Sequence, residues 1–403
     1  MSRATCCYQA KWLIPVDQPP IENGLLSVAD GRIVAVGENL SGAAPIDLGD
    51  VALAPGLVNA HTHLEFSDID APLGEAGMEF PLWIQQVVGR RRAAGELLET
   101  QKAAAISAGI RESQEQGIAA LGEITTMPYS LEMYAEEPGV VSLLELIGLS
   151  PERGAELLEA AKSHLQQGKS RGMAVGLSPH APYSVHRDVV AVAARMSADT
   201  KTPLAMHLAE SRDELQLLDS QSGLFREMLE KFGVWRDDAF SPRKRPVDYL
   251  RMLAVAHHAL LIHGNYFDDA EINFVAARPA KMTVVYCPRT HAYFDHPKHP
   301  LAELLRRGAS LAIGTDSRAS NPDLALWRDV QLAAKSFPEI SPEAWLSMVT
   351  ESPAKALGIE TAFGALAVGR GAKLIAFPLA TEVNSAQLFE AILEVEPQPV
   401  CVS

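Results

Sequence analysis

Two histidines separated by one residue, His61 and His63, are the first side chains in the chain whose type and spacing suggest chemistry. They follow the apolar run PGLVNA, which is typical of a buried strand. Residues i and i+2 of an extended strand face the same side, so both imidazoles could bind one ion. The alternative is a pair of surface or hydrogen-bonded histidines, but the position at a strand end favours metal binding.

Other polar residues of catalytic type stand where further apolar runs end. His207 follows PLAM, Glu210 lies three residues later, and Asp316 follows LAIGT. Each has an ordinary structural alternative: a buried histidine, a glutamate at a helix N-terminus, and an N-cap aspartate. Together, however, three histidines and one carboxylate form a nitrogen and oxygen set that suits Zn²⁺ or Fe²⁺ and leaves a position for water.

The elements that must position these residues are short apolar runs that alternate with longer segments of helical periodicity. Eight candidate strands can be counted: VALAPGLVNA, GIAALGEIT, VVSLLELIGL, MAVGLS, PLAMHL, ALLIHG, MTVVYCP and ASLAIGT. Eight βα units predict a (β/α)₈ barrel, whose active site lies at the carboxyl ends of the strands. An open doubly wound sheet is the alternative, but neither a G-x-G-x-x-G motif after a strand nor a P-loop occurs.

Short strands also begin and end the chain. Asp30-Gly31 between LLSVA and RIVAVG predicts a hairpin, and GALAVGRGAKLIAFPL offers further short strands. We therefore predict a small β-sandwich subdomain formed by residues 1–55 and 362–403, with the barrel over residues 56–361.

Composition excludes several classes of protein. The 403 residues are 47% hydrophobic and carry a formal charge of −15, which argues against nucleic-acid polymers as partners. Four cysteines, two of them adjacent, suit a reducing compartment, and no apolar stretch is long enough for a membrane span. We expect a cytoplasmic protein with a small-molecule substrate. The oligomeric state stays open, a homodimer included.

Five motifs in this order, APGLVNAHTHLEF, SPHAPYS, MHLAES, LIHGN and AIGTDS, resemble the amidohydrolase superfamily. The similarity is to its branch of cytosine, guanine and S-adenosylhomocysteine deaminases and triazine hydrolases, and it spans nearly the whole chain. It implies a distorted (β/α)₈ barrel with a β-sandwich built from both termini, in agreement with the strand count.

The resemblance also implies roles for individual residues. His61, His63, His207 and Asp316 would bind one divalent metal, most simply Zn²⁺, with Fe²⁺ as the alternative. Glu210, His263 and Asp316 would be catalytic, and His180 and Glu210 would contact substrate. Dinuclear members use a carbamylated lysine, but this chain has none between Lys102 and Lys162, which favours a mononuclear site. Glu123 could add a carboxylate, and we leave it out of the metal set.

The expected reaction is hydrolytic deamination. The metal would lower the pKa of a bound water towards about 7, and the resulting hydroxide would attack an amino-substituted aromatic carbon. Asp316 would accept the proton of that water, His263 would hold the water or the developing oxyanion, and Glu210 would carry protons to the ring nitrogen and the leaving amine.

Substrate contacts are expected from the segments that follow the first and seventh strands. Phe66, Phe80 and Trp83 could stack on a flat base, with core packing as the alternative for each one singly. An arginine, Arg289 or one of the run Arg90-Arg91-Arg92, could bind a carboxylate or hydroxyl group. The run Arg90-Arg91-Arg92 is more typical of a solvated helix face.

The segments HTHLEFS and CPRTHAYF resemble those of aminofutalosine deaminases, so the expected substrate is an aminopurine nucleoside of adenosine or aminofutalosine type. A cyclic amide or amidine hydrolase and a triazine dechlorinase are alternatives within the superfamily. A metal-free binding or assembly module is a further alternative, although such a protein should have lost at least one of the ligand-type residues.

Overall fold

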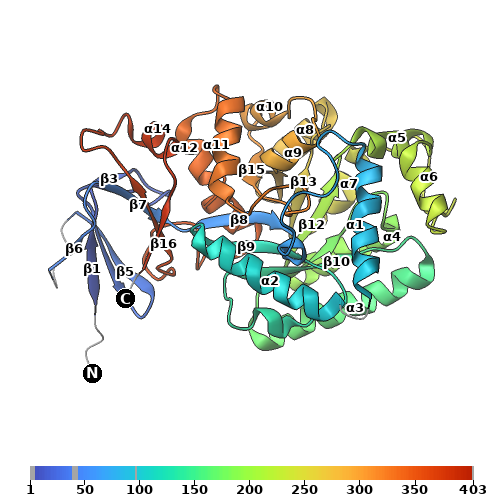
Figure 1. Cartoon of the computed structure of the whole chain (residues 1–403), viewed down its shortest axis with the longest axis horizontal. Helices are drawn as coiled ribbons and strands as arrows, with labels where there is room; N and C mark the ends of the chain where they lie inside the picture. The colour runs from blue at the N-terminus through green and yellow to red at the C-terminus, as the bar shows by residue number, and fades with distance from the viewer. Residues whose placement is uncertain (1–4, 39–43, 96–97, 402–403) are drawn as a thin grey trace.

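A single ring of eight parallel strands forms the centre of the molecule (Figure 1). The computed structural model describes residues 5–38, 44–95 and 98–401. The strands are β8 (Leu57–Thr62), β9 (Ile118–Thr125), β10 (Val140–Leu146), β11 (Val175–Pro179), β12 (Pro203–Leu208), β13 (His258–His263), β14 (Met282–Tyr286) and β15 (Ser310–Ile313). A parallel bridge between Thr62 and Asp316 joins the two ends of the sheet. The predicted (β/α)₈ barrel is confirmed.

Helices cover the outside of this ring (Figure 1). They are α1 (Phe80–Ala94), α2 (Leu98–Glu115), α3 (Pro151–Arg171), α4 (Arg187–Thr200), α5 (Arg212–Ser220), α6 (Leu224–Lys231), α7 (Pro246–Leu253), α8 (Asp269–Ala276), α9 (Pro288–Tyr293), α10 (Leu301–Arg306), α11 (Leu326–Ser336), α12 (Pro342–Ser347), α13 (Glu351–Ala356) and α14 (Leu388–Leu393), with short 3₁₀ turns at η1 (Leu64–Phe66) and η3 (Leu131–Tyr134).

The longest helix, α3, shows why these segments are helical. Ser150 caps its first turn by accepting a hydrogen bond from the Arg153 amide, and the helix ends at Gly172, whose φ is 67°. Its buried Leu157, Ala161 and Leu165 recur every four residues, so they form one stripe against the barrel.

Two smaller sheets lie beside the barrel and carry the other strands. The four-stranded sheet has the order β5 (Arg32–Gly37), β4 (Leu25–Ala29), β1 (Cys6–Gln9) and β6 (Ile46–Asp47). The five-stranded sheet has the order β17 (Gln398–Val400), β16 (Leu374–Pro378), β7 (Val51–Pro55), β2 (Trp12–Leu13) and β3 (Ile21–Glu22). Residues from both ends of the chain, among them Leu26, Leu53 and Leu374, share one buried apolar cluster. The boundaries at residues 55 and 362 stay a prediction.

The hairpin prediction is confirmed, and one strand prediction is wrong in part. β4 and β5 pair antiparallel around Asp30 and Gly31, whose φ values of 50° and 68° are those of a type I′ turn. The run VALAPGLVNA, however, is two strands. It divides at Gly56: β7 belongs to the five-stranded sheet, and only β8 belongs to the barrel. An added Cβ at Gly56 would lie 2.7 Å from the Ala119 Cβ, so this position has no room for a side chain.

The site lies above an apolar layer inside the barrel. Leu143 on β10 and Ala205 on β12 belong to one buried cluster, and Glu145 and His207 come two residues later on the same strands. Because side chains two apart on a strand share a face, both polar groups continue the inward-facing rows. Among the described residues, no helix combines the length and apolar character needed to cross a bilayer.

Candidate metal centre and active-site pocket

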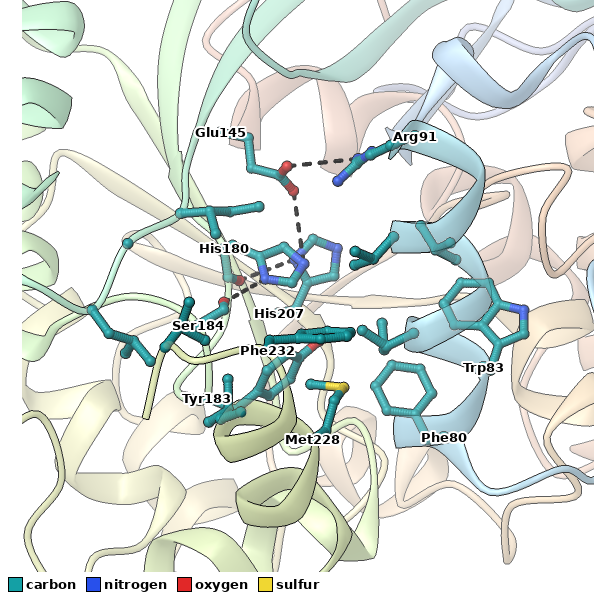
Figure 2. A pocket seen from close by; sticks show the side chains of 18 of the residues that line it. Phe80, Trp83, Arg91, Glu145, His180, Tyr183, Ser184, His207, Met228 and Phe232 are labelled. Carbon is teal, nitrogen blue, oxygen red and sulfur yellow. Dashed lines mark hydrogen bonds and ion pairs between the residues drawn. The ribbon is translucent and has the colours of Figure 1, made fainter. Parts of the chain in front are cut away.

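A cavity of about 640 Å³ opens at the carboxyl ends of the barrel strands. Of the residues predicted for the site, it is lined by His63, Trp83, His180, His207, Glu210 and Asp316. Figure 2 shows aromatic side chains around one part of this pocket, with Glu145, Arg91 and His180 at another. The pocket therefore combines an apolar surface with a small number of charged groups, as small-molecule sites do.

The structure brings the four predicted metal ligands together. The Nε2 atoms of His63 and His207 lie 3.3 Å apart, and Asp316 Oδ1 lies 3.5 Å from His61 Nε2 and 3.6 Å from His63 Nε2. Two donors about 2.1 Å from a tetrahedral ion are separated by about 3.4 Å, so these spacings fit a shared cation.

The surroundings of His61 support the same interpretation. Its side chain is fully buried, and neither ring nitrogen has a hydrogen-bond partner among the residues that the structure describes. Unpartnered buried nitrogens are costly, and a bound cation would satisfy one of them. His61 and Asp316 also form a second donor group with His263, within 4.8 Å of one another. The residues present thus form a histidine-rich site that fits a divalent metal.

A backbone contact fixes the tautomer of His207. Its Nδ1 lies 3.0 Å from the carbonyl oxygen of His180, which can only accept, so Nδ1 carries the proton and Nε2 presents its lone pair. Burial lowers the pKa of His207 well below its usual range, and the neighbouring His61 and His180 lower it further. A neutral imidazole is the form that binds a metal.

Asp316 is held by its backbone at the junction between β15 and β8. Its φ is 58°, its amide donates to the His61 carbonyl at 3.1 Å, and its carbonyl accepts from Thr62 Oγ1 at 2.9 Å. Burial acts to raise the pKa of this carboxyl, but the imidazoles of His61 and His263 outweigh burial and bring the pKa below its usual range. The carboxylate is therefore ionised where it faces the histidines.

Glu210 and His263 form the adjoining pair. Glu210 Oε1 lies 3.2 Å from His263 Nε2, and both side chains are buried. Burial raises the pKa of Glu210 well above its usual range, and the negative charges of Asp316 and Glu214 raise it further. Glu214 also accepts hydrogen bonds from the amides of Ala209 and Glu210, which fixes the loop after β12. The site thus holds one carboxyl whose pKa is raised beside another whose pKa is lowered, a pattern suited to acid and base catalysis.

His180 and Trp83 occupy the pocket wall as predicted, although their contact with substrate stays a prediction. His180 Nδ1 pairs with Ser184 Oγ at 2.6 Å, and burial lowers the pKa of His180 to about 3. The Trp83 indole donates to the Ala319 carbonyl at 3.2 Å and stacks on Phe80 with ring centroids 5.7 Å apart.

Arg289 is not in the pocket, so its assignment as a substrate-binding residue is corrected. Its Nε donates to Asp329 at 2.9 Å and its Nη1 to Asp323 at 2.7 Å, while Nη2 donates to the carbonyl oxygens of Asp323 and Ala325. All three guanidinium nitrogens are thus occupied by acceptors on α11 and in the loop before it. Sequence distance hid this arrangement, because the two carboxylates lie 34 and 40 residues away.

Arg91 lines the pocket together with Arg92, Arg153 and Arg236, although the sequence pattern favours a solvated helix face for the run Arg90-Arg91-Arg92. Within the predicted solvated run, Arg90 and Arg92 are exposed, but Arg91 is half-buried and pairs with Glu65, with Glu145 Oε2 at 3.8 Å. The available signal was helical spacing, since Trp83, Val87 and Arg91 recur every four residues on α1 and all three line the pocket.

Comparisons with known proteins agree with this architecture. The chain is 26% identical over 360 residues to an aminodeoxyfutalosine deaminase of Deinococcus radiodurans, covering 83% of this chain and 82% of that protein. The structure of Helicobacter pylori aminofutalosine deaminase in complex with methylthio-coformycin superposes with a TM-score of 0.85 at 21% identity, over 98% and 97% of the two chains. That of a Xanthomonas campestris adenosine deaminase with bound zinc gives a TM-score of 0.77 at 22% identity, over 97% and 90%.

The two structural similarities, at this level of identity, establish the fold. The family follows from the sequence, because the amidohydrolase family model matches residues 52–402, which include every strand of the barrel and every residue of the histidine and carboxylate cluster. The chain therefore belongs to the amidohydrolase family.

Proposed function

We propose that this protein is a metal-dependent deaminase that releases ammonia by hydrolysis from an aminopurine nucleoside of adenosine or aminofutalosine type. The observation that carries the proposal is the buried Glu210 carboxyl, 3.2 Å from His263 and next to the ionised Asp316, in one apolar pocket. The names of similar proteins, an aminodeoxyfutalosine deaminase and an adenosine deaminase, support the same reaction class.

The cofactor would be one divalent cation per chain, with Zn²⁺ as first choice because three imidazoles and one carboxylate suit it. His61, His63, His207 and Asp316 would hold it. When bound, such an ion lowers the pKa of a water molecule and acts as a Lewis acid.

The residues of the chain would divide the proton transfers between them. Asp316 is ionised and accepts a proton from the attacking water, while His263 holds the oxygen in place. Glu210, whose raised pKa favours the protonated form, donates to the ring nitrogen and then relays a proton to the departing amine. The water oxygen bonds to the ring carbon, and the carbon–nitrogen bond breaks. One water proton ends on the ring nitrogen and the other on ammonia, leaving a ring carbonyl.

The aromatic side chains that line the pocket are suited to binding a flat base. Phe80 and Trp83 on α1, Tyr183 after β11 and Phe232 after α6 all line it. Aromatic faces stack on heterocycles and exclude water from the reacting carbon. Trp83 and His180 are the substrate contacts that we propose from this wall, with Glu210 at the ring nitrogen.

The test is a screen of aminated purines, pyrimidines, pterins and their nucleosides for ammonia release. Activity should depend on the metal: it should disappear after dialysis against a chelator and return when about one equivalent of Zn²⁺ is added. No ammonia from any member of the panel would overturn the deaminase proposal. Chloride from a chlorotriazine or a ring-opened amide would instead identify one of the alternatives in the family. Full activity of a chain with no bound metal would overturn the proposed cofactor.

A cytoplasmic location is part of the proposal, and so is a small-molecule substrate without a nucleic-acid polymer or membrane as partner. Fractionation of the native cell should find the activity in the cytosol. The oligomeric state, a homodimer included, is read from the mass of the purified protein by light scattering.

A further inference from the structure

Of the three acidic side chains that line the pocket in the described part of the chain, Glu145 is the one to which the catalytic scheme gives no role. It lies at the end of β10, its residue is 3% exposed, and it lines the same cavity as His207 and Glu210. Neither of its oxygens has a hydrogen-bond partner in the part of the chain that the structure describes. A buried carboxylate left in this state is costly unless something else donates to it.

The charged and polar neighbours of Glu145 lie close to its carboxylate but do not form hydrogen bonds with it. His180 Nε2 lies 3.7 Å from Oε1, and Arg91 Nη2 lies 3.8 Å from Oε2, so both contacts are longer than hydrogen bonds (Figure 2). Arg91 pairs at hydrogen-bond distance with Glu65, and the other ring nitrogen of His180, Nδ1, pairs with Ser184. The carboxylate is thus positioned by charge, and its hydrogen-bonding capacity remains for a ligand.

Two adjacent acceptor oxygens define the chemistry of that ligand. A carboxylate accepts two hydrogen bonds side by side, and the neutral partner that matches it is a pair of hydroxyl groups on adjacent carbons. The place also suits a substituent of the base. The His180 ring is 4.9 Å from the His207 ring, and Glu145 Oε1 lies 3.7 Å from His180 Nε2, so the His180 ring links Glu145 to the histidine cluster.

We propose that Glu145 binds the vicinal hydroxyl pair of a ribose, so that the pocket selects ribonucleosides over 2′-deoxynucleosides and 3′-deoxynucleosides. This inference rests on the proposed deaminase function, and it assigns a specificity residue that the reaction chemistry does not require.

The charge state of Glu145 is consistent with such a role. Burial raises the pKa of this carboxyl to about 7, against the opposing effect of Arg91. Two donated hydroxyl bonds stabilise the ionised form, because hydrogen bonds to a charged acceptor are the stronger ones. A bound ribose would then supply the hydrogen-bond donors that the Glu145 carboxylate lacks.

The experiment compares kcat/KM for adenosine, 2′-deoxyadenosine and 3′-deoxyadenosine in the metal-loaded protein and in Glu145→Gln. Loss of one hydrogen bond to a charged group should make each deoxynucleoside about 10- to 100-fold poorer than adenosine in the wild type. Glu145→Gln should lower kcat/KM for adenosine by a similar factor and bring the three substrates to within about threefold of one another.

Glu271→Gln on α8 is the matched control, because Glu271 is also buried and paired with an arginine, Arg245, but does not line the pocket. It should keep the preference for ribose. Glu145→Asp is the second variant. Its shorter side chain keeps the negative charge but moves the carboxylate away from the pocket, so the preference for ribose should be reduced.

The possible failures are distinguishable. If the wild type releases no ammonia from the three nucleosides and none from any other aminated heterocycle, the proposed function fails and this inference fails with it. If the wild type deaminates adenosine and both deoxynucleosides equally well, or if Glu145→Gln keeps the preference for ribose, the inference is refuted while the deaminase function stands. The wild-type comparison needs no variant, so a misfolded substitution does not block the test.

Discussion

Glu210→Gln separates catalysis from folding at this site. Burial and the charges of Asp316 and Glu214 raise the pKa of the Glu210 carboxyl well above its usual range, which favours the neutral form of the side chain. An amide has nearly the same shape and no charge, and the free energy of unfolding should change by less than about 1 kcal/mol. The amide cannot relay a proton, however. Loss of a positioned acid and base should lower kcat by about 10²–10⁴-fold, equivalent to about 3–5 kcal/mol of barrier.

The assay follows ammonia release at saturating substrate, with urea unfolding and metal analysis on the same preparations. Metal content should equal that of the wild type, because Glu210 is outside the predicted ligand set. A variant that keeps more than a tenth of the wild-type kcat would refute the assignment of Glu210 as proton carrier. A variant that loses its metal would show that Glu210 acts through the metal centre instead.

Three other substitutions test other parts of the structure. Asp316→Asn should lower kcat by about 10²–10⁴-fold and reduce the metal content with unchanged circular dichroism, whereas retained activity would contradict its role. Arg91→Met should lower the free energy of unfolding by about 3 kcal/mol in urea titrations, because it removes one of the two cationic partners of the buried Glu65 and leaves Lys102 at 3.7 Å and the Thr126 hydroxyl at 3.0 Å; a loss below about 1 kcal/mol would contradict this. His164→Gln tests acid stability. Burial lowers the pKa of His164 to about 4, so its neutral form stabilises the fold above pH 6.5, and about 3 kcal/mol of that stability should be lost as the pH falls to about 4. The wild type should therefore lose that much more stability than His164→Gln between pH 7 and pH 4, and equal losses would refute the assignment.

The barrel could be predicted from the sequence because its strands can be recognised from short, local sequence patterns. Each is a run of apolar residues of strand length, and several of these runs end in a histidine or carboxylate, as at His207, His263 and Glu145. A parallel barrel places all such ends at one rim, so these residues converge even though the chain separates them widely. The exception was VALAPGLVNA, which is divided at Gly56 between two sheets, β7 in the five-stranded sheet and β8 in the barrel.

The sequence by itself determined which residues meet at the rim, His61, His63, His207 and Asp316, because residue type and strand position are local properties. Only the tertiary structure decided that Arg91 lines the pocket and that Arg289 does not. Arg91 turns inward because Glu65 and Glu145 converge on its face of α1, and Arg289 turns away because Asp323 and Asp329 occupy it. A charged side chain of this length goes where its counter-charges lie, and the positions of those counter-charges are set by the packing of distant segments rather than by neighbours in the chain.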